Sequence, residues 1–317
     1  MPARKPDTLY IGGGTPSELS AAEIRELFAV LRRAYPESRF VESTFEGNPE
    51  SLTPEKLDIL AGAGVSRLSI GLQTADDALL RSIGRRHTAA EFAEVFRAAR
   101  RAGSFSISVD LMHGLPGQTL ESLSETLDFT LALGPDHVSI YGLQVEDRTL
   151  FAKRGVEPDE DLGRAMLELA LRRLAEAGLR HYEISNFARQ GHESRHNRIY
   201  WNDGEYVGLG CGAASHLGGI RSTNVDRVLS YCDAVEVGRR PIAESESLAG
   251  RKKLGEKAFL GLRLIDGFEP GAELEREFAP QWRKLENQGL VRRDGGRARL
   301  TPEGIYLANQ AFMEFVS

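Results

Sequence analysis

Short apolar runs alternate with amphipathic segments through the first half of the chain. The apolar runs are bounded by glycine, proline and small polar residues, which is the pattern of buried strands. These runs occupy residues 8–11, 40–45, 67–72, 105–111, 137–143 and 179–184. Regular spacing of this kind predicts one repeating architecture rather than a collection of unrelated segments.

The segments between these runs have helical periodicity. Two of them begin with capping boxes, Ser20 with Glu23 and Thr88 with Glu91, in which a side chain and a backbone amide satisfy each other. Apolar residues then recur on one helical face, as in Ile24, Leu27, Phe28 and Leu31. Because strands that alternate with helical crossovers form parallel sheets, the pattern predicts an α/β fold with helices outside the sheet.

Glycine and polar residues gather where the predicted strands end. Gly12-Gly-Gly-Thr-Pro16 follows the first strand, and Glu46, Gln73 and Asp110 lie at the ends of the next three. In parallel sheets this edge carries the ligand site. A single turn glycine or helix-capping acid has a structural explanation, but four such positions on one edge predict a binding site.

The second half is organised differently. Residues 188–246 are rich in glycine and aromatic residues and form a linking region after a first domain at 1–187. Residues 247–317 combine helices with a hairpin at Gly295-Gly296, as in a winged helix. Charges on such a wing are usually solvated, so no nucleic-acid partner is expected for its arginines, which are Arg292, Arg293, Arg297 and Arg299.

Composition narrows the class of protein. The 317 residues are 41% hydrophobic and 27% charged, which is ordinary for a globular protein of about two domains. No run approaches the roughly 20 apolar residues of a membrane span, and the start lacks a secretory signal. We therefore expect a cytoplasmic protein. The net charge of −6 argues against a surface built to bind nucleic acid.

Only two cysteines occur, Cys211 and Cys232. They suit reduced thiols better than a disulfide framework. An iron–sulfur cluster held by one chain ordinarily needs three or four thiolates, which is more than this chain supplies.

Five motifs in order make the chain resemble a known family. They are Gly12-Gly-Gly-Thr-Pro16, Glu46-Gly-Asn-Pro49, Leu68-Ser-Ile-Gly-Leu-Gln73, Asp110-Leu-Met-His-Gly-Leu-Pro-Gly-Gln-Thr119 and His181-Tyr-Glu-Ile-Ser-Asn-Phe187. The chain resembles the oxygen-independent coproporphyrinogen III oxidase-like radical S-adenosylmethionine (SAM) proteins. It is most similar to their haem chaperone branch, and the resemblance extends over nearly the whole chain.

The resemblance implies a partial parallel (β/α) barrel whose C-terminal edge brings SAM and a [4Fe–4S] cluster together. The positions that match the SAM-contacting motifs are Gly12, Gly13, Thr15, Glu46, Gln73, Arg85 and Asp110. Glycine N–H groups can approach a carboxylate, and acidic side chains can accept from ammonium or hydroxyl groups.

The chain departs from this family at the cluster. Complete members carry a Cys-x3-Cys-x2-Cys loop after the first barrel strand, whereas this sequence begins near the second strand and has no such loop. We therefore expect the first β/α unit to be missing and the chain, as it stands, to lack radical activity. SAM is expected to bind weakly or not at all. A shortened sequence and a natural relative without a cluster both remain open.

A second motif implies haem. His196, Asn197, Tyr200 and Trp201 match the His-Asn-x-x-Tyr-Trp motif of the haem chaperone branch. Histidine is a common haem ligand and aromatic rings offer flat surfaces, although the same residues also suit a packed turn. The implied function is a haem chaperone that delivers haem to respiratory haemoproteins at the membrane. Two alternatives are coproporphyrinogen III oxidation in porphyrin biosynthesis, if the cluster segment is restored, and a nucleic-acid module in the tail.

Overall fold

A computed structural model describes residues 5–36, 38–145, 147 and 150–316. The chain divides into two compact units, Met1–His196 and Asn197–Ser317. Each unit has its own sheet or sheets.

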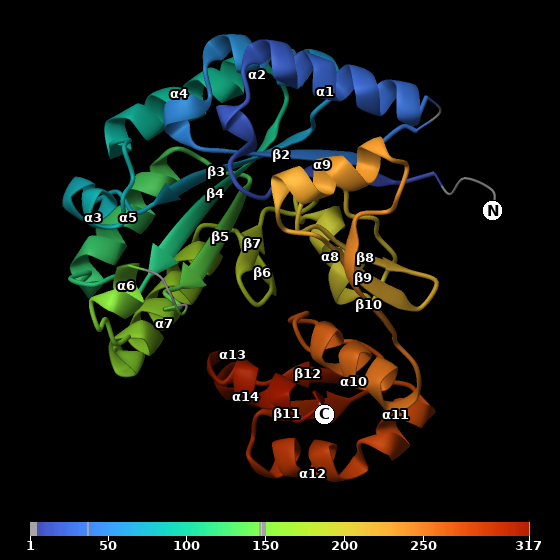
Figure 1. Cartoon of the computed structure of the whole chain (residues 1–317). Coiled ribbons are helices and arrows are strands. Elements are labelled where there is room, and N and C mark those ends of the chain that lie inside the picture. Colours follow the sequence, from blue (N-terminus) through green and yellow to red (C-terminus); the bar gives the residue numbers. More distant parts are fainter. Residues whose placement is uncertain (1–4, 37, 146, 148–149, 317) are drawn as a thin grey trace. The chain divides into compact units, whose positions relative to one another are not determined.

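The first unit is a curled half-barrel sheet with the strand order β1-β2-β3-β4-β5-β7-β6 (Figure 1). Neighbouring strands from β1 to β5 are parallel, which confirms the predicted α/β fold. The strands are β1 (Thr8–Ile11), β2 (Glu42–Gly47), β3 (Arg67–Gln73), β4 (Ser106–His113), β5 (His137–Gly142), β6 (Arg180–Glu183) and β7 (Asn186–Ala188).

Helices join the strands and cover the outer face of the sheet. Helices α1, α2 and α4 lie side by side (Figure 1). Both predicted capping boxes are present, at Ser20 with Glu23 and at Thr88 with Glu91. The helices are η1 (Pro16–Glu18), α1 (Ala21–Ala34), η2 (Pro49–Ser51), α2 (Pro54–Ala63), α3 (Asp77–Ser82), α4 (Ala89–Ala102), α5 (Leu120–Ala132), α6 (Leu150–Lys153) and α7 (Glu160–Glu176).

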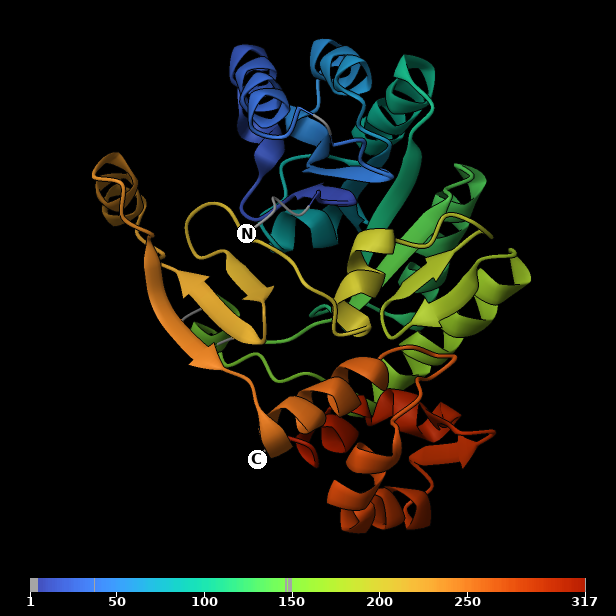
Figure 2. The same cartoon turned by 90° about the vertical axis from the view of Figure 1, so that its right-hand side faces the viewer.

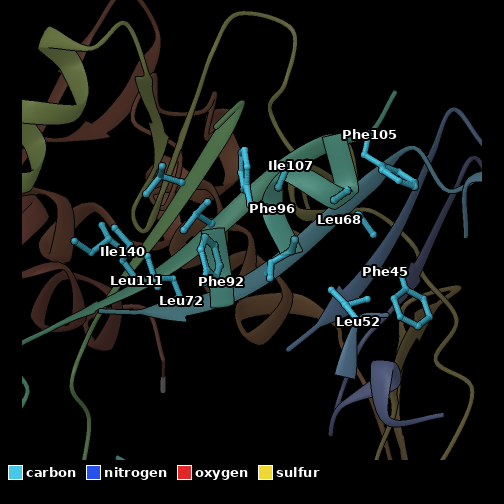
Figure 3. Close-up of a cluster of buried hydrophobic side chains, with 14 of the residues drawn as sticks. Phe45, Leu52, Leu68, Leu72, Phe92, Phe96, Phe105, Ile107, Leu111 and Ile140 are labelled. Carbon is cyan, nitrogen blue, oxygen red and sulfur yellow. The ribbon is translucent and has the colours of Figure 1, made fainter. Parts of the chain in front are cut away.

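Alternation along the strands separates an apolar face from a polar one. The outer face carries buried residues such as Phe45, Leu68 and Ile107, which pack with Phe92 and Phe96 of α4 in one core (Figure 3). The residues between them point to the inner face, because successive side chains in a strand alternate. This inner face, the lumen, is lined by polar side chains that carry the candidate chemistry.

The far end of the sheet differs from the sequence expectation. The last strand predicted for the first domain is residues 179–184, but Asn186–Ala188 forms a further strand, β7, and pairs antiparallel with both β5 and β6. A tight hairpin between β6 and β7 therefore places β7, not β6, next to β5. The turn includes a bond from the Ser185 N–H to a carboxylate oxygen of Glu183, at 3.1 Å.

The second unit contains a small sheet and a C-terminal domain (Figure 2). Helix α8 (Arg195–Trp201) starts in the first unit and continues into the second. The other elements of the second unit are β8 (Ala214–Leu217), β9 (Ile220–Asn224), α9 (Val228–Glu236), β10 (Ile242–Ser247), α10 (Gly250–Gly261), α11 (Ala272–Glu277), α12 (Ala279–Asn287), β11 (Val291–Asp294), β12 (Arg297–Leu300), α13 (Pro302–Tyr306) and α14 (Ala308–Met313). Among the described residues, every helix is too short or too polar to cross a bilayer.

Candidate functional site

Glu46 and the glycine loop after β1 are in direct contact. The Tyr10 hydroxyl donates to one Glu46 oxygen, and the Gly13 N–H donates to the other at 3.2 Å. A Cβ on Gly12 would lie 2.6 Å from the Tyr10 ring and 2.8 Å from the Glu46 carboxyl carbon. Gly12 is therefore required because Tyr10 and Glu46 fill the space of a side chain, whereas Gly13 is favoured by its φ of 79°.

Gln73 and Arg85 meet around Gly71. Gln73 is buried and has a φ of 71°, which is uncommon for a residue with a side chain. Its Nε2 atom lies 2.7 Å from where a Cβ on Gly71 would be, and an Arg85 nitrogen lies 3.8 Å from the same point. Arg85 Nη1 also donates to Asn48 Oδ1 at 2.8 Å. Arg85 is thus held by Asn48, which the sequence analysis did not single out as a site residue.

Asp110 lies one strand further along the same edge. The Ser69 hydroxyl on β3 lies 3.0 Å from both carboxylate oxygens of Asp110. Burial raises the pKa of Asp110, with a smaller contribution from the charge of Glu46, while Ser139 and Ser69 oppose the rise. Burial likewise raises the pKa of the Tyr141 hydroxyl at the end of β5. The edge therefore holds two acidic side chains, Glu46 and Asp110, which suits a ligand that bears positive charge or hydroxyl donors.

Thr15 starts the short helix η1. Its carbonyl accepts the Glu18 N–H at 3.0 Å, and its side chain makes no capping hydrogen bond. Its neighbours Gly13 and Gly14 both have positive φ. The loop Gly12–Thr15 thus turns sharply after β1 beside the Glu46 carboxylate.

Helix α8 begins inside the lumen. The buried Glu42 carboxylate on β2 accepts the backbone N–H groups of Arg195 and His196, each at 2.9 Å. A carboxylate at a helix N-terminus satisfies amides that have no partner within the helix. In the segment that precedes α8, the His192 carbonyl accepts a hydrogen bond from Arg67 of β3 at 2.9 Å. The start of the predicted haem motif is therefore fixed to the barrel by a charged residue from β2.

The side chain of His196 contacts β1. Its Nδ1 lies 2.8 Å from the Thr8 hydroxyl, and its ring stacks on Tyr10 with centroids 5.0 Å apart. Burial lowers the pKa of His196, and the nearby Glu42 charge offsets part of that effect. The imidazole is therefore favoured in its neutral form, in which a ring nitrogen can bind a metal.

The rest of the motif lies in the second unit. Tyr200 packs edge-on against Tyr206, with centroids 4.6 Å apart, and burial raises the Tyr200 pKa to about 12. The Arg263 guanidinium lies 4.2 Å from the Trp201 ring centroid. Within the described residues, the buried Trp201 Nε1 has no hydrogen-bond partner. Asn197 is half-buried beside His196 in the first turn of α8.

The wing arginines have partners within their own unit. Arg293 makes two bonds of 2.8 Å to Glu286, and Arg297 donates to the Asp266 and Gly267 carbonyls. Arg292 and Arg299 both pair with Asp294. These contacts match a structural role for the wing charges.

One further cluster, formed by Asp203, His216 and Glu256, has the composition of a metal site. Lys253 contacts Asp203 at 2.5 Å and His216 Nε2 at 3.2 Å, and Arg221 pairs with Glu256. Two cations already neutralise its carboxylates, so we regard it as an ion-pair network.

Sequence reasoning missed Thr8, Tyr10 and Glu42. Thr8 and Tyr10 are two positions apart in β1 and therefore lie on the same face of the strand, a spacing that was visible in the sequence. The contact from Glu42 to α8 spans more than 150 residues, and no local pattern predicts such a pairing.

The residues at the edge of the half-barrel suit SAM, whereas the cysteines of the chain do not suit a [4Fe–4S] cluster. Gly13 has open space within 4 Å of its missing Cβ, and the buried Thr44 hydroxyl in the lumen has no partner within the described part of the chain. These features suit a ligand with polar groups at this edge. By contrast, Cys211 and Cys232 are exposed residues of the second unit, and residues 1–196 contain no cysteine. The thiols of this chain do not fit a [4Fe–4S] cluster.

Comparisons with known proteins agree with this architecture. The model of the radical SAM superfamily matches residues 3–130, and the HemN C-terminal domain matches residues 248–307. The fold is similar to that of coproporphyrinogen III oxidase HemN from Escherichia coli, with a TM-score of 0.84 and 24% identity. That match covers 99% of this chain and 78% of the oxidase.

Curated relatives are similar over almost the whole chain. The haem chaperone HemW of Bacillus subtilis (strain 168) is 37% identical over 98% of this chain and 85% of its own length. The haem chaperone HemW of Lactococcus lactis subsp. lactis (strain IL1403) is also 37% identical, over 98% and 84%. A mitochondrial radical SAM domain-containing protein 1 of Bos taurus is 33% identical over 99% and 76%.

Proposed function

Because this chain belongs to the HemW haem chaperone family of radical SAM proteins, we propose that it binds haem through α8 and passes it to haemoproteins. The observation that carries the proposal is the placement of His196. Its neutral imidazole lies in the lumen of the half-barrel, fixed by Glu42, Thr8 and Tyr10. A histidine held in this way loses little conformational freedom when it binds a ligand.

The other residues of the motif have separate roles in this proposal. Asn197 and Tyr200 supply polar groups beside the macrocycle. Trp201 supplies a buried N–H donor, which suits an acceptor such as a propionate, and Arg263 holds the indole ring by a cation–π contact. We propose respiratory haemoproteins at the membrane as the class of acceptor.

The edge of the half-barrel is proposed to hold SAM. Glu46 and Asp110 would accept from its ammonium and ribose hydroxyl groups, Gly12 and Gly13 would let its carboxylate approach the backbone, and Arg85 would pair with that carboxylate. Thr15 and Gln73 would lie beside it at the same edge. When bound beside a cluster, SAM supplies radical chemistry, but the thiols of this chain do not fit that cluster and we derive no radical step. The likeness to coproporphyrinogen III oxidase is one of fold, and its activity is not proposed.

Haem titration of the purified chain tests the proposal. The Soret band of haem is expected to shift on binding to the wild type, with about tenfold weaker affinity for His196→Ala. His181→Ala is the matched control, because His181 is a half-buried histidine that stacks on Phe187 instead. Equal affinities for the wild type and His196→Ala would refute the role of the motif.

A further inference from the structure

Tyr10 touches both candidate sites of the first unit. One face of its ring stacks on His196 at 5.0 Å with an interplanar angle of 27°. Its hydroxyl donates to Glu46, whose other oxygen accepts the Gly13 N–H. One side chain therefore joins the first histidine of the α8 motif to the carboxylate of the proposed cofactor edge.

Tyr10 has little freedom to move. Strand pairing sets Thr8 opposite Glu42 and Tyr10 opposite Thr44, so the contacts with α8 and with Glu46 arise on adjacent strands in register. Gly12 covers Tyr10 and Glu46 so closely that a Cβ there would overlap both. Because the space is filled, a displacement of the Glu46 carboxylate has to be taken up by the Tyr10 ring, and through it by His196.

The hydrogen bond between Tyr10 and Glu46 has a defined direction. Burial, and next the charge of Glu46, raise the pKa of the Tyr10 hydroxyl, which keeps it protonated. Tyr10 is thus the donor and Glu46 the acceptor. A ligand ammonium that pairs with Glu46 withdraws charge from this bond, since both draw on the same carboxylate oxygens.

We propose that Tyr10 is a positioning residue shared by the two sites, through which the charge on Glu46 sets the haem affinity of α8. The inference rests on the proposed function, because it takes His196 as part of the haem site. Neutralising Glu46, as a bound ammonium group does, changes haem affinity, and by linkage haem binding changes the affinity of the edge for that ligand.

Four variants of the full chain test this link. Tyr10→Phe removes the hydroxyl and keeps the ring stack. Glu46→Gln removes the charge, and the double variant removes both. Tyr35→Phe, at the end of α1, is the control for loss of a tyrosine hydroxyl. Each protein is measured by haem titration and, without haem, by NMR of the His196 imidazole, whose signals are identified by their loss in His196→Ala.

The proposal predicts a coupled pattern. Tyr10→Phe and Glu46→Gln each shift the His196 imidazole signals and change the haem dissociation constant by about fivefold, a typical lower bound for coupled sites. The double variant matches a single variant, because the same link is broken, and Tyr35→Phe resembles the wild type. Unmoved imidazole signals, or effects that add in the double variant, would overturn the proposal.

The imidazole measurement separates this inference from the proposed function. If haem binds equally to the wild type and His196→Ala, the haem role of the motif fails. The shift of the His196 signals in Glu46→Gln still reports whether Tyr10 joins the two side chains.

Discussion

Gly12 and Gly13 are adjacent glycines with different reasons to be glycine. Gly12 has no room for a Cβ, which would overlap Tyr10 and Glu46, whereas Gly13 has open space and a positive φ. Gly12→Ala is expected to lower the free energy of unfolding by about 1–3 kcal/mol through overpacking. It should also weaken haem binding, because Tyr10 has to move.

Gly13→Ala provides the comparison for this prediction. The left-handed backbone costs an alanine about 1–2 kcal/mol, with no overlap at Tyr10. Urea unfolding and haem titration of both variants check the difference. Similar haem affinities for the two variants would show that the space beside Tyr10 does not matter.

The individual site residues show what the sequence could predict. Gly12, Gly13, Glu46, Gln73 and Asp110 follow from the rule that strand ends share one edge, whereas Arg85 was implied only by the family resemblance. The contacts within that edge could not be predicted, because Asn48 reaches Arg85 and Ser69 reaches Asp110 only once the strands are in register. The sequence assigned His196 to a motif but did not indicate its contact with Tyr10.

Helix α8 is too short to be stable by itself. With seven residues it depends on tertiary contacts, since isolated helices of fewer than about 12 residues are marginal in water. Its N-terminus is held by Glu42, and near its C-terminus the Trp201 ring contacts Arg263, which follows α10. The position of the motif is therefore set by residues far from it in sequence.

Arg263→Leu tests the contact at Trp201. Loss of a partly desolvated cation–π contact is expected to cost about 1–2 kcal/mol of stability and to expose the indole. Acrylamide quenching of tryptophan fluorescence should therefore increase. Arg251→Leu is the matched control, because Arg251 lies 4.2 Å from the ring centroid of Phe278, which contributes no tryptophan signal. Equal quenching in both variants would contradict the assignment of Arg263 as the residue that covers Trp201.

The predicted order of elements was accurate where local signals are strong. Periodicity and capping boxes identified the strands and helices of the half-barrel, and Gly295-Gly296 identified the hairpin of β11 and β12. The β6–β7 hairpin was missed because β7 has only three residues and lacks a strand-like run. The pairing of β7 with β5 depends on tertiary contacts, which the local sequence does not specify.

The residues of the proposed sites fall in both units of the chain. The first unit contains the proposed SAM edge and His196, and the second contains Asn197, Tyr200 and Trp201. The family relationship and the placement of α8 together favour haem as the ligand of this motif.

The most direct test is to locate the haem. Oxidised haem is paramagnetic and broadens the NMR signals of nearby amides in the deuterated, ¹⁵N-labelled chain. The account predicts that one equivalent of haem broadens the amides of residues 195–201 and 8–11, with zinc protoporphyrin as the diamagnetic reference. Broadening centred on another part of the chain, such as residues 291–300, or spread evenly over the surface would contradict it.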